Sequence, residues 1–256
     1  MPRAVDLATL IRAFLESENV SDLTENLGCA ASMLGFDRFA MGHHVDLTAP
    51  PDNVVRITNY DPAWIDRALE AGFYRDDPVH FASTRTAAGF LWSDMDQLVE
   101  LSERQRSILA AAREHGLCEG YTVPVHVPGE YRGTCSFGAR EARAADPGVL
   151  AIANLIGLYA FEAGRKIMHK ANASLMPSPV PKLTERQRDT LVLIGRGKAD
   201  SEIAAVLGIS PSTAHEHAEN VRKAYGNAQR PNLIARALFD GQISFADVLT
   251  GRIVGL

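Results

Sequence analysis

The sequence predicts an α+β fold in which an α/β/α sandwich is followed by a smaller, all-α domain of four helices. Three observations lead to this prediction. In the first 170 residues, segments with helical periodicity precede and follow short strand-like runs. Prolines then occupy every second position from 177 to 181, and the residues after them form a series of segments with clear helix caps. We therefore expect domains at residues 1–170 and 183–256, joined by a semi-rigid linker at 171–182.

The helices and strands of the first domain are predicted from the spacing of apolar residues along the chain. Apolar residues recurring every three to four positions predict helices, and β-branched or aromatic runs bounded by turn residues predict strands. Helices on either side of a short sheet give the sandwich. The expected helices are 4–18, 22–35, 62–72, 102–115 and 146–170, and the expected strands are 39–45, 54–58, 121–127 and 133–139.

The four helices of the second domain are delimited by their caps. Thr184 with Gln187 forms a capping box, and that first helix ends at Gly195 or Gly197. The second helix is expected from about Asp200 to Leu207, with Gly208 as its left-handed stop. Ser210 caps the third helix ahead of Pro211, and the fourth starts near Asn232 and reaches Asp240. Ala214, Val221 and Ala224 are expected to face inward or to permit close approach.

Composition sets the class of protein. Apolar residues make up 46% and charged residues 22%, as in soluble globular domains, and no apolar run reaches the roughly 18 residues of a membrane span. The first 20 residues read as an amphipathic helix rather than a signal peptide. Three cysteines without a CxxC pair favour a reducing, cytoplasmic setting. The net charge of −5 does not indicate nucleic-acid binding by itself, although a local positive stripe suffices.

A helix-turn-helix is predicted where the second and third helices of the last quarter meet, because a short helix, a tight turn and a longer capped helix occur in that order. The alternative is a plain packing module with a polar outer face. The pattern of this segment is carried by residues at fixed distances from one another along the chain: Leu183, Thr184, Arg186, Leu191, Gly197, Lys198, Glu202, Ile203, Ala204, Leu207, Ile209, Ser210, Ser212, Thr213, His217, Asn220, Lys223 and Arg230. With these residues, the segment resembles the C-terminal DNA-binding domain of the LuxR family of bacterial transcription regulators.

This resemblance implies a set of DNA-binding residues. Lys198, Lys223 and Arg230 are expected near phosphates, and Ser212, Thr213 and His217, with Asn220 on the same helix, near bases or backbone. With so little net positive charge, one copy should bind weakly, so a homodimer on an inverted repeat of promoter DNA is expected. One departure is Ala199, where the family has threonine; Asp200 or Ser201 is then expected to cap the second helix.

Residues 59–81, NYDPAWIDRALEAGFYRDDPVHF, crowd aromatic side chains around adjacent aspartates. Asp61 is a good N-cap, so Trp64 lies in the first turn of a helix and shares a face with Ala68. Tyr60, Trp64, Asp77, Pro78, Trp92, Gly120, Thr122, Pro124 and Ser136 together resemble the autoinducer-binding domain of quorum-sensing LuxR proteins, which bind N-acyl homoserine lactones.

The resemblance implies ligand-binding residues Tyr60, Trp64, Ala68, Asp77, Trp92 and Ser136. Trp64 would donate to a lactone carbonyl, an ionised Asp77 would accept an amide N–H, and Tyr60 and Ser136 would donate to an acyl carbonyl. Trp92 would form an apolar wall. The bland alternatives are that the tryptophans are ordinary core and that Asp77 only makes a turn before proline; Asp76 is assigned to solvent or to a cap.

Ala68 departs from the family, which commonly has tyrosine there, and this predicts a roomier or less polar pocket. We expect a long, bulky or aromatic acyl group, or a ligand outside the lactone class. Two rival functions remain open: a regulator that acts without a ligand, and an enzyme using one of the histidines with Cys118 or Cys135. No metal spacing or nucleophile motif supports the enzyme, so no catalytic residue, metal or cofactor beyond the signal is expected. The expected mechanism is ligand-linked folding or dimerisation, with the 146–170 helix and parts of the C-terminal domain in the dimer contact.

Overall fold

The protein is described from a computed structural model that defines residues 7–51, 54–141, 146–171 and 180–250. The chain divides into two compact units, one formed by residues 1–126 with 131–176 and the other by residues 127–130 with 177–256. Most of the expected linker, residues 172–179, lies outside the described residues. The domain boundaries drawn from the sequence therefore stay a prediction.

The first unit is built on a five-stranded antiparallel sheet of order β2-β1-β5-β4-β3. Every residue of the central strand β5 is buried, because helices cover both faces of the sheet. The register sets Ser136 directly opposite Thr122 on one side and Ala40 on the other. The strands are β1 Arg38–His43, β2 Arg56–Thr58, β3 Phe90–Leu91, β4 Glu119–Val125 and β5 Gly133–Ala139.

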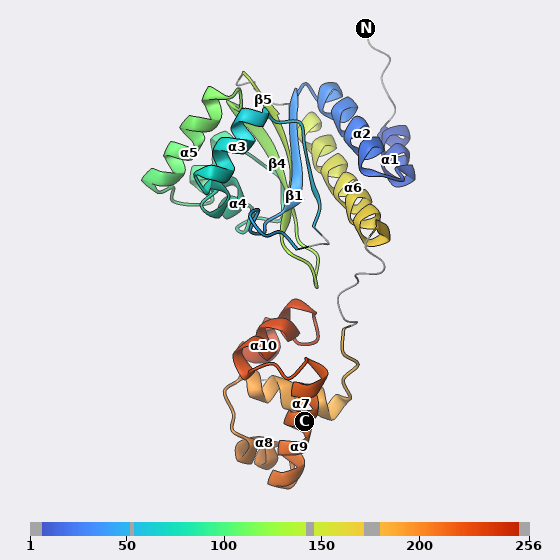
Figure 1. The fold of residues 1–256 in the computed structure, drawn as a ribbon, viewed down its shortest axis with the longest axis vertical. Helices are drawn as coiled ribbons and strands as arrows, with labels where there is room; N and C mark the ends of the chain where they lie inside the picture. The colour runs from blue at the N-terminus through green and yellow to red at the C-terminus, as the bar shows by residue number, and fades with distance from the viewer. Residues whose placement is uncertain (1–6, 52–53, 142–145, 172–179, 251–256) are drawn as a thin grey trace. The chain divides into compact units, whose positions relative to one another are not determined.

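Helices on the two faces complete an α/β/α sandwich, which confirms the predicted fold class (Figure 1). One layer consists of α1 Leu7–Glu16, α2 Val20–Met33 and α6 Pro147–Ala171. The other consists of α3 Pro62–Glu70, α4 Pro78–Ser83 and α5 Glu103–Glu114, with the short 3-10 helices η1 Phe73–Arg75 and η2 Trp92–Gln97.

Helix α6 lies close against the sheet because glycines face it. A Cβ atom at Gly157 would come within 2.9 Å of Val123, and one at Gly164 within 3.1 Å of Met41. By length and composition α6 is apolar enough to cross a membrane, so the expectation that no segment reaches this limit is wrong. Its buried residues pack on the sheet, as in the core helix of a globular domain.

Residues 180–250 of the second unit form five helices, one more than predicted. The capping box of Thr184 with Gln187 and the Ser210 cap both form, and Gly208 has φ +64°. The helices are α7 Glu185–Gly195, α8 Asp200–Leu207, α9 Pro211–Ala224, α10 Arg230–Phe239 and α11 Phe245–Leu249. The fifth, α11, has too few residues to show a helical period. Helix α10 starts at Arg230, two residues before the expected Asn232.

Two local predictions in this unit are wrong. Neither Asp200 nor Ser201 caps α8, because Ala199 holds the N-cap position and its N–H is accepted by Glu202 Oε2 at 2.9 Å. Ala224 is exposed rather than inward-facing. Ala214 and Val221 are fully buried as expected, and the small Ala214 allows α9 to pack closely on α8.

Candidate ligand pocket and nucleic-acid interface

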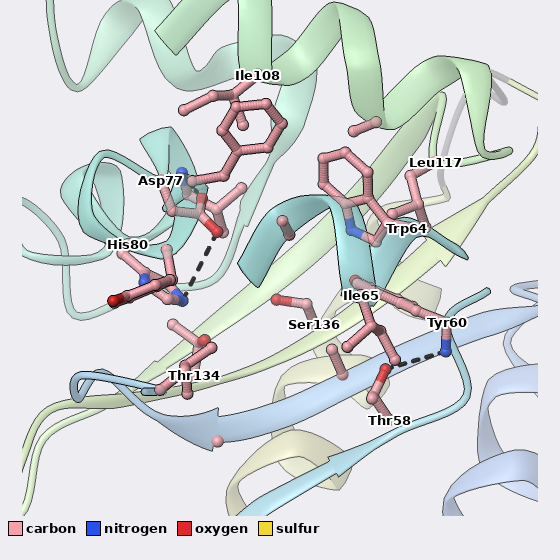
Figure 2. A pocket seen from close by; sticks show the side chains of 18 of the residues that line it. Thr58, Tyr60, Trp64, Ile65, Asp77, His80, Ile108, Leu117, Thr134 and Ser136 are labelled. Atoms are coloured by element: carbon pink, nitrogen blue, oxygen red, sulfur yellow. Dashed lines mark hydrogen bonds and ion pairs between the residues drawn. The ribbon is translucent and has the colours of Figure 1, made fainter. Parts of the chain in front are cut away.

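A cavity of about 240 Å³ lies between the sheet and the layer of α3, α4 and α5 (Figure 2). Aliphatic and aromatic side chains make most of its wall, and a few polar groups converge on it, which is the usual character of a small-molecule site. All six residues predicted from the sequence line this cavity: Tyr60, Trp64, Ala68, Asp77, Trp92 and Ser136.

Helix α3 presents Trp64 because its start is fixed by a cap. Asp61 accepts a hydrogen bond from the N–H of Ala63 at 3.0 Å, with Pro62 at the first helical position. The Trp64 ring is 9% exposed and packs against Ile108 and Leu117. Its indole N–H has no hydrogen-bond partner among the described residues. Trp64 is therefore both a core residue and a donor available to the cavity.

Asp77 caps α4 and lines the cavity at the same time. Its Oδ1 accepts the N–H of Val79 at 2.8 Å, so the turn before Pro78 is a genuine helix start. Its Oδ2 lies 3.8 Å from Nε2 of His80 (Figure 2). One carboxylate oxygen therefore serves the fold, and the other remains available to a ligand.

The Tyr60 phenol remains a donor at physiological pH. Burial, and to a lesser degree the charge of Asp77, raises the pKa of Tyr60 well above its usual value. Its hydroxyl has no partner within the described part of the chain, whereas its backbone N–H is held by Thr58 Oγ1 at 3.0 Å. Tyr60 and Trp64 thus each offer the cavity an unpaired donor, and Asp77 offers it an acceptor.

Ser136 and Trp92 are linked through Thr122, a fully buried residue behind the cavity wall to which the sequence assigned no role in binding. Trp92 Nε1 donates to Thr122 Oγ1 at 2.9 Å, and Thr122 Oγ1 is 2.8 Å from Ser136 Oγ. The expectation of a purely apolar wall at Trp92 is therefore incomplete. The strand register was the available signal, since Thr122 and Ser136 are cross-strand partners.

A histidine pair lies beside the cavity, and only its His80 member is part of the wall. The rings of His44 and His80 stack with centroids 3.7 Å apart, and His44 Nε2 is 3.2 Å from Thr134 Oγ1. Burial, reinforced by His80 and His126, lowers the pKa of His44 to about 2, so it is neutral at pH 7. The sequence offered two signals for these residues. His80 lies three positions after Asp77, on the same face of a helix, and Thr134 lies two positions before Ser136, on the same face of a strand.

The groups considered for catalysis have other environments. Asp76 pairs with Arg104 at 2.5 Å, so the two adjacent aspartates form no catalytic pair. Burial raises the pKa of the Cys135 thiol to about 12, which disfavours the thiolate a nucleophile needs. Among the described residues no group of three or more histidine, cysteine or acidic side chains is arranged to hold a metal ion.

Most of the predicted DNA-contacting residues lie on α9, whereas Lys198 precedes α8 and Arg230 begins α10. Thr213, His217 and Asn220 follow one another at helical spacing and are half-buried, whereas Lys223 is exposed. The hydroxyls of Ser212 and Thr213 both lie 2.8 Å from Ser210 Oγ at the start of the helix.

The other two predicted phosphate contacts are paired within the free domain. Lys198 Nζ lies 2.8 Å from Glu202, and Arg230 Nη2 lies 2.5 Å from Asp200. Asp200 also holds His215 Nδ1 at 2.8 Å, which joins the start of α8 to α9 and α10. His215 thus has a carboxylate partner within the domain.

Comparisons with known proteins match both units. A family model described as autoinducer binding domain matches residues 19–164, and one described as bacterial regulatory proteins, luxR family, matches residues 181–237. The HTH-type quorum-sensing regulator RhlR of Pseudomonas aeruginosa is 29% identical over 204 residues, spanning 75% of this chain and 77% of that protein. The regulatory protein SdiA of Escherichia coli is 25% identical over 237 residues, spanning 92% and 95%.

The fold is also similar to solved structures. A structure of SdiA in complex with octanoyl-rac-glycerol aligns over 93% of this chain and 95% of that one, with a TM-score of 0.62 and 24% identity. This likeness concerns the arrangement of helices and strands. The matches with RhlR and SdiA are with transcription regulators, and neither is described as an enzyme.

Proposed function

The chain belongs to the LuxR family of quorum-sensing transcription regulators, and from that premise we propose that it binds an N-acyl homoserine lactone-type signal in its first unit and promoter DNA, as a homodimer, through its second. The observation that carries the ligand half is the convergence of Tyr60, Trp64, Asp77 and Ser136 on one mostly apolar cavity.

The polar groups of the cavity match the polar groups of an acyl lactone. Trp64 offers an N–H to the lactone carbonyl, and Asp77 Oδ2 accepts the amide N–H in a charge-assisted hydrogen bond. Tyr60 and Ser136 supply hydroxyls for the acyl carbonyl. The remaining wall is apolar enough for an acyl tail, and Ala68 leaves room there for a long or bulky one.

The DNA half of the proposal rests on α9 as the recognition helix. Ser212, Thr213, His217 and Asn220 would reach base edges or the backbone, and Lys223 a phosphate. Lys198 and Arg230 would exchange their carboxylate partners for phosphates on binding. These contacts suit a cytoplasmic protein that reads an inverted repeat with two copies.

The dimer contact is proposed on the exposed side of α6. Leu155, Leu158 and Tyr159 are 42%, 41% and 38% exposed and form an apolar stripe on the side of α6 turned away from the sheet. Large exposed apolar side chains grouped in this way are typical of an interface rather than of free surface. A second copy of α6 is the occupant expected from a homodimer.

A ligand outside the lactone class is the second candidate. The SdiA structure holds octanoyl-rac-glycerol, which presents hydroxyl donors and an ester carbonyl but no amide. In this chain Asp77 and His80 lie side by side and would suit hydroxyls equally well. A regulator that acts without any ligand is the third possibility.

Mass spectrometry of small molecules extracted from the purified full-length protein tests these candidates. We expect an acyl lactone retained at one molecule per chain, without hydrolysis on prolonged incubation. Asp77→Asn keeps a good helix cap but removes the charge, so it should lower retention about tenfold, the loss of roughly 1.4 kcal/mol. Asp76→Asn, next to it but paired with Arg104, is the matched control and should retain ligand normally.

The other outcomes each point to a different function. A retained acyl glycerol would replace the lactone with the second candidate. An empty protein that binds its operator equally well with and without added lactone would be a ligand-independent regulator. Steady conversion of the lactone to a hydrolysed product would identify an enzyme.

A further inference from the structure

A chain of three hydrogen-bonding groups, the last two of them buried, runs from the edge of the sheet to the ligand cavity. It connects Trp92 of η2, Thr122 of β4 and Ser136 of β5, with links of 2.9 Å and 2.8 Å between their side-chain atoms. Thr122 is 0% exposed and Ser136 is 5% exposed. Only the Ser136 end borders the cavity as a hydroxyl (Figure 2).

The direction of these hydrogen bonds follows from the chemistry of the groups. An indole N–H can only donate, so Thr122 Oγ1 must accept from Trp92. The Thr122 hydroxyl has one proton of its own, and Ser136 Oγ is its only other partner in the described structure. If Ser136 donated instead, the Thr122 proton would be buried without an acceptor, which is unfavourable. Thr122 therefore donates to Ser136.

The position of the Trp92 ring supports a fixed arrangement. A Cβ atom at Gly120 would come within 2.5 Å of the ring, so a side chain there is excluded and the indole lies directly on strand β4. Glu119 Oε1 also accepts the N–H of Ser93, the residue after Trp92, at 3.2 Å. The donor at the start of the chain is thus held by the sheet itself.

We propose that Trp92 and Thr122 are positioning residues that make the Ser136 hydroxyl a hydrogen-bond donor toward the ligand. Once Ser136 accepts from Thr122, its own proton has no acceptor among the described side chains and is left for the cavity. The site then requires a ligand with an acceptor oxygen, such as a carbonyl, facing Ser136. This inference rests on the proposed function and adds to it the two residues that orient the Ser136 hydroxyl.

The first test needs no ligand. The full-length chain contains two tryptophans, so its ¹H–¹⁵N spectrum has two indole signals, and Trp92→Phe assigns them. In Thr122→Val, which keeps shape but loses the hydroxyl, we expect the Trp92 indole proton to move upfield and exchange faster. Thr122→Ser should restore the wild-type signal, and the Trp64 signal should not move. An unchanged Trp92 signal in Thr122→Val would overturn the proposal.

The second test measures coupling between Thr122 and Ser136. Binding of N-dodecanoyl homoserine lactone is measured by calorimetry for wild type, Thr122→Val, Ser136→Ala and the double variant. We expect Thr122→Val to weaken binding three- to tenfold when Ser136 is present and less than twofold when it is alanine. Thr122→Ser should bind like the wild type. Equal weakening in both backgrounds would show that Thr122 acts only through packing and would overturn the proposal.

The two tests separate failure of this inference from failure of the proposed function. If the indole result holds but the wild type binds neither N-dodecanoyl homoserine lactone nor 1-octanoyl-glycerol, the ligand assignment is wrong and the requirement for an acceptor oxygen falls with it. If the wild type binds the lactone but Thr122→Val changes neither the indole signal nor the affinity, the function stands and the hydrogen-bond chain has no role in it.

Discussion

At the scale of single residues, several side chains of the pocket both stabilise the fold and present a polar group to the cavity. Asp77 starts a helix with one oxygen and faces the cavity with the other, and Trp64 packs in the core while its N–H remains unpaired. The choice between structural and functional interpretations of such residues is therefore a false one. A ligand that completes these pairings would also complete the core, which is the physical basis for ligand-linked folding.

His44 makes the first unit sensitive to acid. Its pKa is about 2 in the folded protein, against about 6.5 when unfolded, so between these values the unfolded chain binds the additional proton. The His44 contribution to stability is therefore greatest above pH 6.5 and falls as the pH drops below it. From pH 8 to pH 5 the His44 contribution to the free energy of unfolding should decrease by about 2 kcal/mol.

The measurement is urea unfolding of the full-length protein, followed by circular dichroism at pH 8 and pH 5. His44→Gln retains an amide for Thr134 and should lose about 2 kcal/mol less than the wild type over this range. His169→Gln, an exposed histidine of the same unit, is the control and should lose as much as the wild type. Equal losses in all three proteins would contradict the role of His44.

At the scale of elements, sequence patterns located the long helices and missed the short ones. Amphipathic runs such as α5 and α6 were predicted to within two residues, because many positions report the same period. Helix α4, strand β3 and the two 3-10 helices have six residues or fewer, so their sequences show no helical or strand period. The only local signal for any of them was Asp77 before Pro78, a favourable start for helix α4. Some cavity residues contributed by these elements, such as Val79 and His80, were missed for the same reason, whereas Trp92 of η2 was predicted through the family resemblance.

Helix α8 offers a stabilising substitution. Ala199 has the extended backbone of an N-cap but no side-chain acceptor, and only Glu202 reaches back to it. Ala199→Thr should supply the missing acceptor and stabilise α8 by about 1 kcal/mol. Amide hydrogen exchange of peptides covering residues 200–207 should then slow by about fivefold. Ala205→Thr, the same change at an exposed mid-helix position, should not slow it.

Helix α3 sets the width of the cavity. Ala68 lies one turn from Trp64 on the wall of the cavity, so Ala68→Tyr would introduce a ring into the space proposed for the ligand. We expect the affinity for N-dodecanoyl homoserine lactone, relative to the N-butanoyl compound, to fall by about tenfold, or about 1.4 kcal/mol. Ala63→Tyr, on the exposed face of α3, should change neither affinity. If Ala68→Tyr left both unchanged, the cavity would not be the binding site.

At the scale of the whole molecule, the family resemblance and the physical reading agree on a ligand-binding unit and a DNA-binding unit. What the sequence could not supply was contact between distant residues. The pairing of Asp200 with His215 and Arg230, and the two hydrogen bonds between Trp92 and Ser136 through Thr122, join side chains 14 to 30 positions apart and depend on the packed fold. No local pattern encodes such contacts.

The proposed dimer can be tested on α6. Leu155→Glu places a charge within the apolar stripe and should convert a dimer to monomers, raising the dissociation constant at least a hundredfold, or roughly 2.7 kcal/mol. Leu15→Glu on α1 is the matched control, because Leu15 is 46% exposed against 42% for Leu155. Sedimentation velocity measures both. A variant at Leu155 that remains as dimeric as the control would exclude this face.

The two tryptophans of the chain, Trp64 and Trp92, both line the same cavity, and the second unit has none. Intrinsic fluorescence is therefore a label-free optical reporter of the cavity, and its quenching would give ligand affinities directly. Helix α9 itself carries no tryptophan. Any change in tryptophan emission when operator DNA is added would thus report a signal that has travelled from one unit to the other.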